Sequence, residues 1–291
     1  MTLSIDEMPA TPVAGISASR KRKRARPGLR LGGASGTTLG VIVIWLSLLV
    51  LIPLAAVVGK AFSGGWHAFW AAITDSVTAD ALKLTIGLSV AAALINAVMG
   101  TLVAWALVRD RPRGSGIFEM VIDIPFALPT IVAGVVTLAL YGSDGLGPNL
   151  FGTKLGIFVA LLFVTLPFTV RTVQPVLLDL DVDAEQAAAS LGASTPTVFR
   201  RIVLPQITPA VASGAALSFA RALGEFGSLV LISSNLPHNT LIASSLIFGK
   251  IQDGSEAAKV QASAIATVLL LTSAVVLVLL DIVQRRVARR G

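Results

Sequence analysis

Residues 40–59 read GVIVIWLSLLVLIPLAAVVG, a run without a single charged side chain. A helix of about 20 apolar residues crosses the roughly 30 Å hydrocarbon core of a bilayer. Because the backbone must satisfy its own hydrogen bonds there, such a run is predicted to be a spanning helix. It is longer than the ~7–15-residue apolar core of a signal peptide and lacks a convincing small-residue cleavage site, so we interpret it as a retained anchor.

Further hydrophobic segments of similar length follow along the 291-residue chain. They occupy approximately residues 81–108, 119–141, 155–178, 208–234 and 260–284. The whole chain is 54% hydrophobic and only 13% charged, whereas a soluble domain carries about 25% charged residues. The sequence therefore predicts an all-α membrane protein with six transmembrane helices, forming one domain over residues 36–291.

Positively charged residues gather beside four of the segment ends. They are Arg20, Lys21, Arg22, Lys23, Arg24, Arg26 and Arg30 before the first segment, Arg109, Arg111 and Arg113 after the second, Arg200 and Arg201 after the fourth, and Arg285, Arg286, Arg289 and Arg290 after the sixth. The alternate loops hold only the isolated lysines Lys60, Lys154, Lys250 and Lys259. Because positive charge is retained on the cytosolic side, both termini are predicted to be cytosolic.

The N-terminal residues 1–35 are polar and rich in Ser, Gly and Pro, and we interpret them as a disordered basic cytosolic tail. The formal charge of +7 falls in clusters between hydrophobic runs. Contact with membrane lipid headgroups explains those clusters better than a nucleic-acid partner does. The chain has no cysteine, which excludes disulfides and thiolate metal sites.

The loop between the fourth and fifth segments reads DVDAEQAAASLGASTPTVFRRIVLP over residues 181–205. Asp183, with Gln186 three residues later, predicts a capping box at a helix start. Gly192 predicts the end of that helix, because glycine tolerates the positive φ of a helix stop. The first half of the loop is therefore predicted to be a short helix.

A second short helix is predicted in the same loop. Thr195 can cap it, with Pro196 in its first turn, and Pro205 is predicted to end it. Thr208 and Pro209 repeat the start signal for the fifth span. Both loop helices are too short to be stable alone in water. They must pack either on the bundle's own end or on a separate partner, and the physics alone leaves both open.

The loop resembles the signature loop of the permeases of ATP-binding cassette (ABC) importers, which reads E-A-A, three residues, G, nine residues, I-x-L-P. The matching positions are Gln186 in place of the pattern's Glu, preceded by Glu185, then Ala187, Ala188, Gly192, Ile202, Leu204 and Pro205. In that family the loop forms coupling helices that sit in a cleft of the ATPase subunit. The resemblance implies the same ATPase-coupling role for these residues.

Three further stretches, 123–134, 166–177 and 218–228, are similar to the sulfate/thiosulfate importer permeases, in particular their T-type subunit. The resemblance covers roughly residues 40–285. It implies a type I importer permease fold in the bacterial inner membrane and a heterodimer with a W-type permease. It also implies two ATPase subunits and an extracytoplasmic sulfate-binding protein as partners. Permeases for molybdate or tungstate share much of the pattern and remain an alternative.

No catalytic machinery is evident in the sequence. No G-x-x-x-x-G-K-[ST] phosphate loop occurs, and His67 and His238 are far apart. The chain is therefore predicted to be no enzyme, with no catalytic residue, no metal ligand and no bound cofactor. The family resemblance places ATP and Mg in the partner ATPases.

Arg221 and Glu225 fall inside the fifth segment, where a charged residue costs about 2.5–3.5 kcal/mol at a helix centre. The two are four residues apart, so they share a helix face and can pair. They form either a structural ion pair against a partner permease or part of the translocation pathway. Gly224 and Gly227 beside them are predicted to allow close helix approach.

Arg171 lies about 10 Å from the end of the fourth segment at 1.5 Å per residue. It either extends to the headgroups or lines the pathway. The predicted mechanism is alternating access, in which ATP-driven motion of the coupling loop flips paired permeases. A secondary anion transporter acting alone is the alternative from another class, but it would require inverted repeats, and no clear repeat is present.

Overall fold

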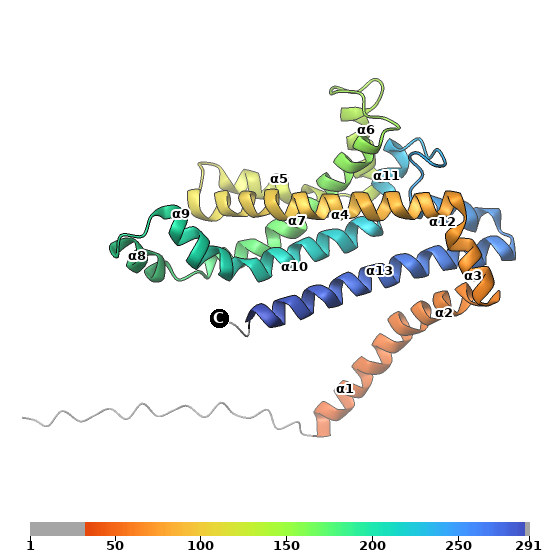
Figure 1. Cartoon of the computed structure of the whole chain (residues 1–291), viewed down its shortest axis with the longest axis horizontal. Helices are drawn as coiled ribbons and strands as arrows, with labels where there is room; N and C mark the ends of the chain where they lie inside the picture. Colours follow the sequence, from red (N-terminus) through yellow and green to blue (C-terminus); the bar gives the residue numbers. More distant parts are fainter. Residues whose placement is uncertain (1–32, 289–291) are drawn as a thin grey trace, which may run out of the picture. The chain divides into compact units, whose positions relative to one another are not determined.

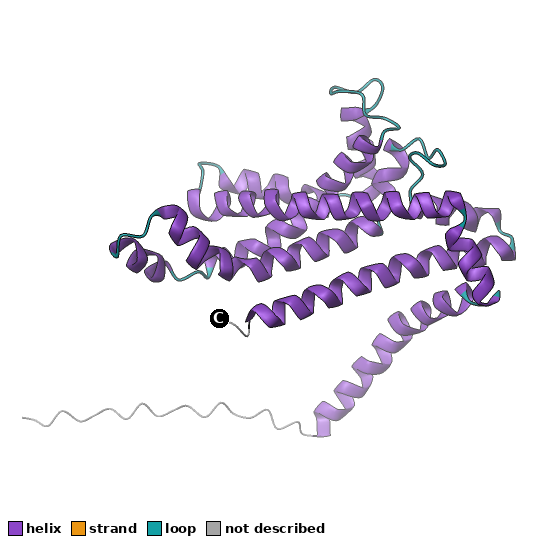
Figure 2. Ribbon diagram, viewed as in Figure 1, coloured by secondary structure: helices purple, strands orange, loops and turns teal. Residues whose placement is uncertain are grey.

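The computed structural model describes residues 33–288, and every regular element in that range is a helix (Figure 1). The elements are α1 (Gly33–Leu46), η1 (Ser47–Leu51), α2 (Ile52–Ala61), α3 (Gly65–Thr74), α4 (Ser76–Trp105), η2 (Ala106–Asp110), α5 (Ser115–Ala127), α6 (Thr130–Tyr141), α7 (Lys154–Leu178), α8 (Val182–Ser190), α9 (Thr195–Val198), η3 (Phe199–Val203), α10 (Leu204–Leu223), α11 (Gly227–Ile232), α12 (Ala243–Asp253) and α13 (Glu256–Ala288). The three η elements are π-helical turns. Figure 2 shows helices joined by loops throughout, which confirms the all-α prediction for the described residues.

The described residues fall into two units, 33–51 and 52–288. In the first unit α1 continues into η1, and its large apolar side chains are exposed. In the second unit α2 to α13 pack together around several buried apolar clusters. Nearly all of the predicted N-terminal tail lies outside the described residues, as do Arg289 and Arg290. The single domain predicted over 36–291 stays a prediction.

Several helical stretches are long and apolar enough to cross a bilayer. Within residues 33–288 they are five, Gly36–Ala61, Ser76–Asp110, Lys154–Leu178, Thr195–Leu223 and Glu256–Ile282, with a sixth if the bent pair α5–α6 is one span. Their positions agree with the hydrophobic segments of the sequence. The length and composition of each run therefore located it correctly, although two of the runs have a different internal structure.

The sequence predicts one straight helix for the third segment, but the structure has two helices there, α5 and α6. Helices α5 and α6 meet at an angle of 116° around Leu128 and Pro129. Leu128 is extended (φ −80°, ψ 134°), as expected of a residue whose helical conformation is disfavoured by the proline that follows. Hydropathy does not detect such a break, because both halves are equally apolar.

The fifth segment is also broken. Helix α10 ends at Leu223, and α11 begins at Gly227 after a three-residue interruption. The interruption contains Gly224, Glu225 and Phe226. The expectation of one helix over 208–234 is therefore wrong at its far end, and Glu225 lies on irregular backbone.

The near end of the same segment differs in the opposite way. The chain is helical without interruption from Thr195 to Leu223. Pro205 lies in the first turn of α10 instead of ending a helix, and the Thr208 hydroxyl donates to the Leu204 carbonyl (2.6 Å) instead of capping. Pro205 has no backbone N–H to donate. The π-helical turn η3 just before it has a hydrogen-bond pattern that differs from that of an α-helix, and the chain stays helical through both. The predicted stop at Pro205 and restart at Thr208 are both wrong.

Helices α4, α7 and α10 approach one another closely around Thr169 of α7, which is fully buried. A Cβ placed on Gly100 of α4 would lie 2.7 Å from the Thr169 Cβ. One placed on Gly214 of α10 would lie 2.8 Å from the Thr169 Cα. Such distances are too short for any side chain, so only glycine fits at both positions. Small residues at helix interfaces are typical of membrane bundles, where packing has to stabilise helix association.

Polar bonds hold the same three helices in register. The Asn96 side chain of α4 donates to the Thr165 hydroxyl of α7 (2.8 Å). Ser218 of α10 donates to the Thr165 carbonyl (3.0 Å), and its hydroxyl lies 3.1 Å from that of Thr169. All four side chains are buried. In an apolar surrounding each would be costly to leave without a partner, so these bonds specify how the helices align.

Replacing Gly214 with alanine is expected to destabilise the bundle by about 1–3 kcal/mol, because the new methyl group overpacks against Thr169. The thermal unfolding midpoint of the purified protein in detergent measures the effect. Gly87→Ala in α4 is the control, since a Cβ there meets no atom within 4 Å. Equal midpoints for Gly214→Ala and the wild type would contradict the close-packing account.

Candidate functional site

The loop after α7 begins with a helix, as predicted, but its cap is two residues earlier. Asp181 precedes α8, and its carboxylate accepts a bond from the Asp183 backbone N–H (2.9 Å). The predicted capping box of Asp183 and Gln186 is therefore wrong. Gly192 follows the helix with φ +85°, which confirms the predicted helix stop at positive φ.

The second loop helix also begins one residue earlier than predicted. Ser194 precedes α9, and Thr195 is already its first residue. Pro196 lies in the first turn, as expected, because its missing N–H would have no partner there. The helix then continues through η3 into α10, so this half of the loop belongs to a long helix rather than to a separate short one.

A cluster that the sequence analysis missed ties α8 to the end of α4. Arg109 in η2 donates to the Glu185 carboxylate, and both side chains are about four-fifths buried. The Arg109 guanidinium also lies over the Trp105 ring, 5.4 Å from its centroid. Trp105 meets Phe199 of η3 edge to face at 5.4 Å. Glu185 is therefore engaged within the chain, and nothing local in the sequence pairs it with a residue 76 positions away.

The signature-loop residues differ in exposure. Gln186, Ala187, Gly192, Leu204 and Pro205 are exposed, whereas Glu185, Ala188 and Ile202 are partly buried. The tip of the loop carries Leu191, which is 89% exposed beside Gly192. Ala187, one helical turn before Leu191, is also exposed, so the end of α8 presents apolar side chains that the described residues do not cover.

Arg221 and Glu225 are paired as predicted, with Arg221 Nη2 2.9 Å from Glu225 Oε2. The Glu225 side chain is fully buried, and its other oxygen accepts bonds from the Ser228 N–H and hydroxyl, each 3.0 Å. Ser244 of α12 donates to the Glu225 carbonyl (2.8 Å). Glu225 thus holds together the ends of α10, α11 and α12 where the fifth span is interrupted. The Arg221 side chain keeps one third of its surface exposed.

The two glycines predicted to allow close packing behave differently. A Cβ on Gly227 would lie 2.2 Å from the Thr130 hydroxyl oxygen at the start of α6, so this position requires glycine. A Cβ on Gly134 would likewise meet the Gly227 carbonyl at 2.9 Å. Around Gly224, by contrast, nothing lies within 4 Å. The packing prediction is confirmed for Gly227 and is wrong for Gly224 within this chain.

Arg171 pairs with a residue of another helix instead of extending to the headgroups. Its Nε donates to Asp123 Oδ1 of α5 (2.8 Å), a second bond runs from Nη2 to Oδ2, and Nη1 donates to Gln174 (2.8 Å). Gln174 in turn donates to Glu119 of α5 (3.3 Å). Asp123 is the first residue of the stretch 123–134, and no local pattern in the sequence pairs it with Arg171, 48 residues away.

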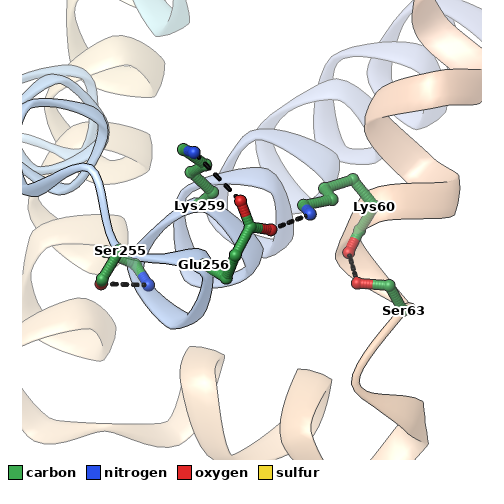
Figure 3. Close-up of polar contacts among 6 residues, drawn as sticks. Lys60, Ser63, Ser255, Glu256 and Lys259 are labelled. Atoms are coloured by element: carbon green, nitrogen blue, oxygen red, sulfur yellow. Dashed lines mark hydrogen bonds and ion pairs between the residues drawn. The ribbon is translucent and has the colours of Figure 1, made fainter.

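A second polar cluster lies at the junction of α2 and α13. Figure 3 shows the Glu256 carboxylate between Lys60 and Lys259. The side chains of Lys60, Lys259 and Glu256 are all exposed. A cavity of about 670 Å³ opens beside it and is also lined by Lys250 and Asp75. Its mixed charges favour no single ligand, so the cluster is best described as a tie between two helices.

No arrangement for catalysis is present in the part of the chain that the structure describes. No group of three His, Cys, Asp or Glu residues there could hold a metal ion. His67 and His238 are not brought together: His238 Nδ1 lies 2.7 Å from Asp80 Oδ2 at the start of α4. The charged groups instead form pairs between or within helices.

The fold matches that of solved transporter structures. Solved structures of a bacterial ABC transporter involved in the import of the polysaccharide alginate superpose with a TM-score of 0.71. The match covers 86% of this chain and 94% of that chain at 16% sequence identity. A second structure, of the alginate transporter in complex with a pentasaccharide-bound periplasmic protein, gives 0.71 at 17% identity. At that identity the likeness establishes the fold, which is that of an ABC importer permease.

The chain belongs to the family described as the binding-protein-dependent transport system inner membrane component, which matches residues 96–290. Proteins named as the sulfate transport system permease protein CysT are similar over most of their length. The one from Synechocystis sp. is 42% identical over 253 residues, covering 84% of this chain and 87% of that protein. The one from Escherichia coli is 38% identical over 276 residues, covering 92% and 96%.

Family membership has direct consequences. The chain is a multi-pass permease of the inner membrane. It is a transport component and not itself an enzyme, as predicted. It works in a binding-protein-dependent ABC system, which in general includes an ATPase and a binding protein.

Replacing Arg109 with glutamine is expected to loosen α8, because Glu185 loses its ion-pair partner. Coupling between contacting residues is about 1 kcal/mol, so amide hydrogen exchange of residues 182–190 should become about fivefold faster. Arg113→Gln removes the same charge from an exposed position of the neighbouring turn and is the control.

The reciprocal variant Glu185→Gln should have a similar effect, and the double variant should be little worse than either single one. Strictly additive effects of the two substitutions on exchange would contradict a direct interaction between Arg109 and Glu185.

Proposed function

We propose that this chain is one of two permease subunits of an ATP-driven importer of sulfate. The observation that carries the substrate is the identity of 38–42% to sulfate transport permeases, sustained over more than four-fifths of both chains. Thiosulfate is a second substrate of the same charge. Molybdate or tungstate is the competing assignment, since permeases for those anions share much of the motif pattern.

The proposed topology has six spans with both termini in the cytosol, as the placement of lysine and arginine requires. The bent pair α5–α6 then serves as the third span. The α8 end of the bundle is cytosolic, and the loop with α3 is external. In this topology the predicted basic tail, residues 1–35, lies on the cytosolic side.

The coupling surface is the loop over residues 181–205, with Gln186, Ala187, Ala188 and Gly192 at its centre. Its exposed leucine, Leu191, is the observation that favours a docked ATPase over packing on the bundle, because the bundle does not cover it. Fully burying such a side chain stabilises a complex by about 1.5–3 kcal/mol.

Motion of this loop reaches the membrane interior through the uninterrupted helix from Thr195 to Leu223. That helix of 29 residues is about 43 Å long at 1.5 Å per residue. It carries Ile202, Leu204 and Pro205 near the loop and Arg221 near its far end. A displacement imposed by the ATPase is therefore carried along this helix to Arg221, which pairs with Glu225 beyond the helix end.

The proposed pathway passes Arg221 and Arg171, with the buried Glu225 paired behind Arg221 and with Gly224 and Gly227 at the helix interruption. Arg221 attracts the dianion, and Glu225 prevents it from binding too tightly. A conducting site has to bind weakly enough to release its ion. Gly224, around which this chain leaves open space, provides room for the anion or for the second permease.

The complete assembly in this proposal is a heterodimer with a homologous W-type permease, bound to two ATPase subunits. An extracytoplasmic sulfate-binding protein delivers the anion. ATP and Mg are used by the ATPase subunits, and this chain binds no cofactor. The proposed mechanism is alternating access by rigid-body motion of the paired permeases.

Uptake by the complete transporter in proteoliposomes tests the substrate. Labelled sulfate should accumulate only with ATP present, and excess unlabelled sulfate or thiosulfate should abolish the uptake while molybdate leaves most of it. Uptake of molybdate in preference to sulfate would assign the chain to the competing class. Accumulation of sulfate by this chain alone would instead indicate a secondary transporter.

Replacing Leu191 with serine is expected to weaken ATPase binding about tenfold to a hundredfold, because the apolar contact is lost. Copurification of the ATPase subunit with tagged permease measures it. Leu146→Ser is the matched control, since Leu146 is 92% exposed in the loop before α7 on the proposed outer side. Unchanged recovery of the ATPase with Leu191→Ser would remove Leu191 from the docking surface.

A further inference from the structure

The ion pair of Asp123 and Arg171 lies within the membrane-spanning part of the bundle. Arg171 is seven residues before the end of α7, about 10 Å along the helix axis, and Asp123 is eight residues after the start of α5, about 12 Å. Both side chains nevertheless keep much of their surface exposed, 33% for Arg171 and 46% for Asp123. Something other than this chain must therefore cover or solvate them.

Hydrocarbon does not suit that exposed surface. A charged group within the bilayer faces the bundle interior or a water-filled cavity, because exposure to lipid costs several kcal/mol. Helix α5 has a separate side suited to lipid, formed by the exposed apolar residues Ile117, Met120 and Val121. Glu119 and Asp123, four residues apart, form a polar stripe on a different side.

The polar stripe leads toward the Arg221–Glu225 pair. Asp123 lies four residues before the end of α5 at Ala127, and Thr130 begins α6 just beyond the bend. Thr130 touches Gly227, whose neighbour Ser228 donates to Glu225. The two charged pairs therefore lie one after the other along α5 and the bend that follows it.

The geometry points to a second anion station in the pathway, in which Asp123 occupies the place of the transported oxyanion on Arg171. The guanidinium donates two nearly parallel bonds to the Asp123 carboxylate through Nε and Nη2. Planar oxyanions and tetrahedral ones such as sulfate present oxygens at the spacing this fork requires. The inference rests on the proposed function, since it concerns sulfate.

Arg171 can exchange the bound dianion for the Asp123 carboxylate, and this exchange explains how the station releases its ion. A dianion that arrives from the Arg221 level has to displace Asp123, and the tethered carboxylate returns when the dianion leaves. Gln174 holds the guanidinium in place from the same helix throughout (2.8 Å). Asp123 therefore acts as a competitor built into the chain, which keeps sulfate bound weakly on the α8 side.

The test compares Asp123→Asn with wild type in the complete reconstituted transporter. The asparagine keeps the shape of the side chain but competes less for Arg171. In vesicles whose lumen faces the α8 end, sulfate in the lumen should therefore inhibit uptake by Asp123→Asn at a concentration about tenfold lower than for wild type. Sulfate uptake should fall accordingly, and Arg171→Gln in the same background should restore weak inhibition. An unchanged inhibition constant in a folded, ATP-hydrolysing Asp123→Asn transporter would overturn the inference.

Cysteine labelling provides a readout that a merely structural ion pair would not move. The chain has no native cysteine, so single replacements report without background from it. Phe126→Cys lies seven residues after Glu119 on the polar side, and Met120→Cys lies on the apolar side. We expect a charged, membrane-impermeant thiol reagent to modify Phe126→Cys alone, and sulfate to slow the reaction.

The outcomes distinguish a failure of the anion station at Arg171 from a failure of the proposed function. If wild type imports sulfate but Phe126→Cys is unreactive, the pair lies in a dry interface with the second permease, and the inference fails while the proposed function stands. If wild type imports no sulfate, both fail. Protection of Phe126→Cys by sulfate, together with the shifted inhibition of Asp123→Asn, supports both.

Discussion

The contact of α4, α7 and α10 around Thr169 is the constraint on which the rest of the structure depends. Because Gly100 and Gly214 have no side chain, α4 and α10 can both contact α7 at Thr169. In a bilayer the lipid is as apolar as the protein, so close packing and interhelical bonds have to hold helices together. The same helix α10 connects the loop at one end to the interruption that contains Glu225 at the other.

That helix gives the chain a simple way to transmit motion. Its uninterrupted course from Thr195 to Leu223 joins the surface loop to the interrupted span without a joint between them. The contacts of Trp105 with Phe199 and of Arg109 with Glu185 join the same loop to α4. A force on the loop therefore reaches two of the three core helices together, which favours rigid-body motion over local bending.

The sequence predicted where the chain crosses the membrane but not where its spans break. Hydropathy locates apolar runs because burial in lipid demands them, and it is insensitive to backbone geometry. Pro129 precedes the bend of the third span, whereas Pro205 lies in the first turn of a helix that continues through it, and hydropathy does not distinguish the two. The local signals for Gly192 and for the Arg221–Glu225 pair were confirmed. The equally local cap and stop signals of the 181–205 loop were not, because neighbouring residues precede the helices and the second helix continues past Pro205.

Long-range pairs could not be predicted in the same way. Arg171 and Asp123 are 48 residues apart on different helices, and only the folded bundle brings them together. In both charged pairs the arginine is partly exposed, and each pair lies beside a broken span. Irregular backbone within a membrane is tolerated where it is buried in protein or lines a water-filled space, and paired charges are tolerated in the same places. By that principle, the breaks at Pro129 and Glu225 and the two ion pairs are expected to lie where protein or water covers them, as the proposed pathway requires.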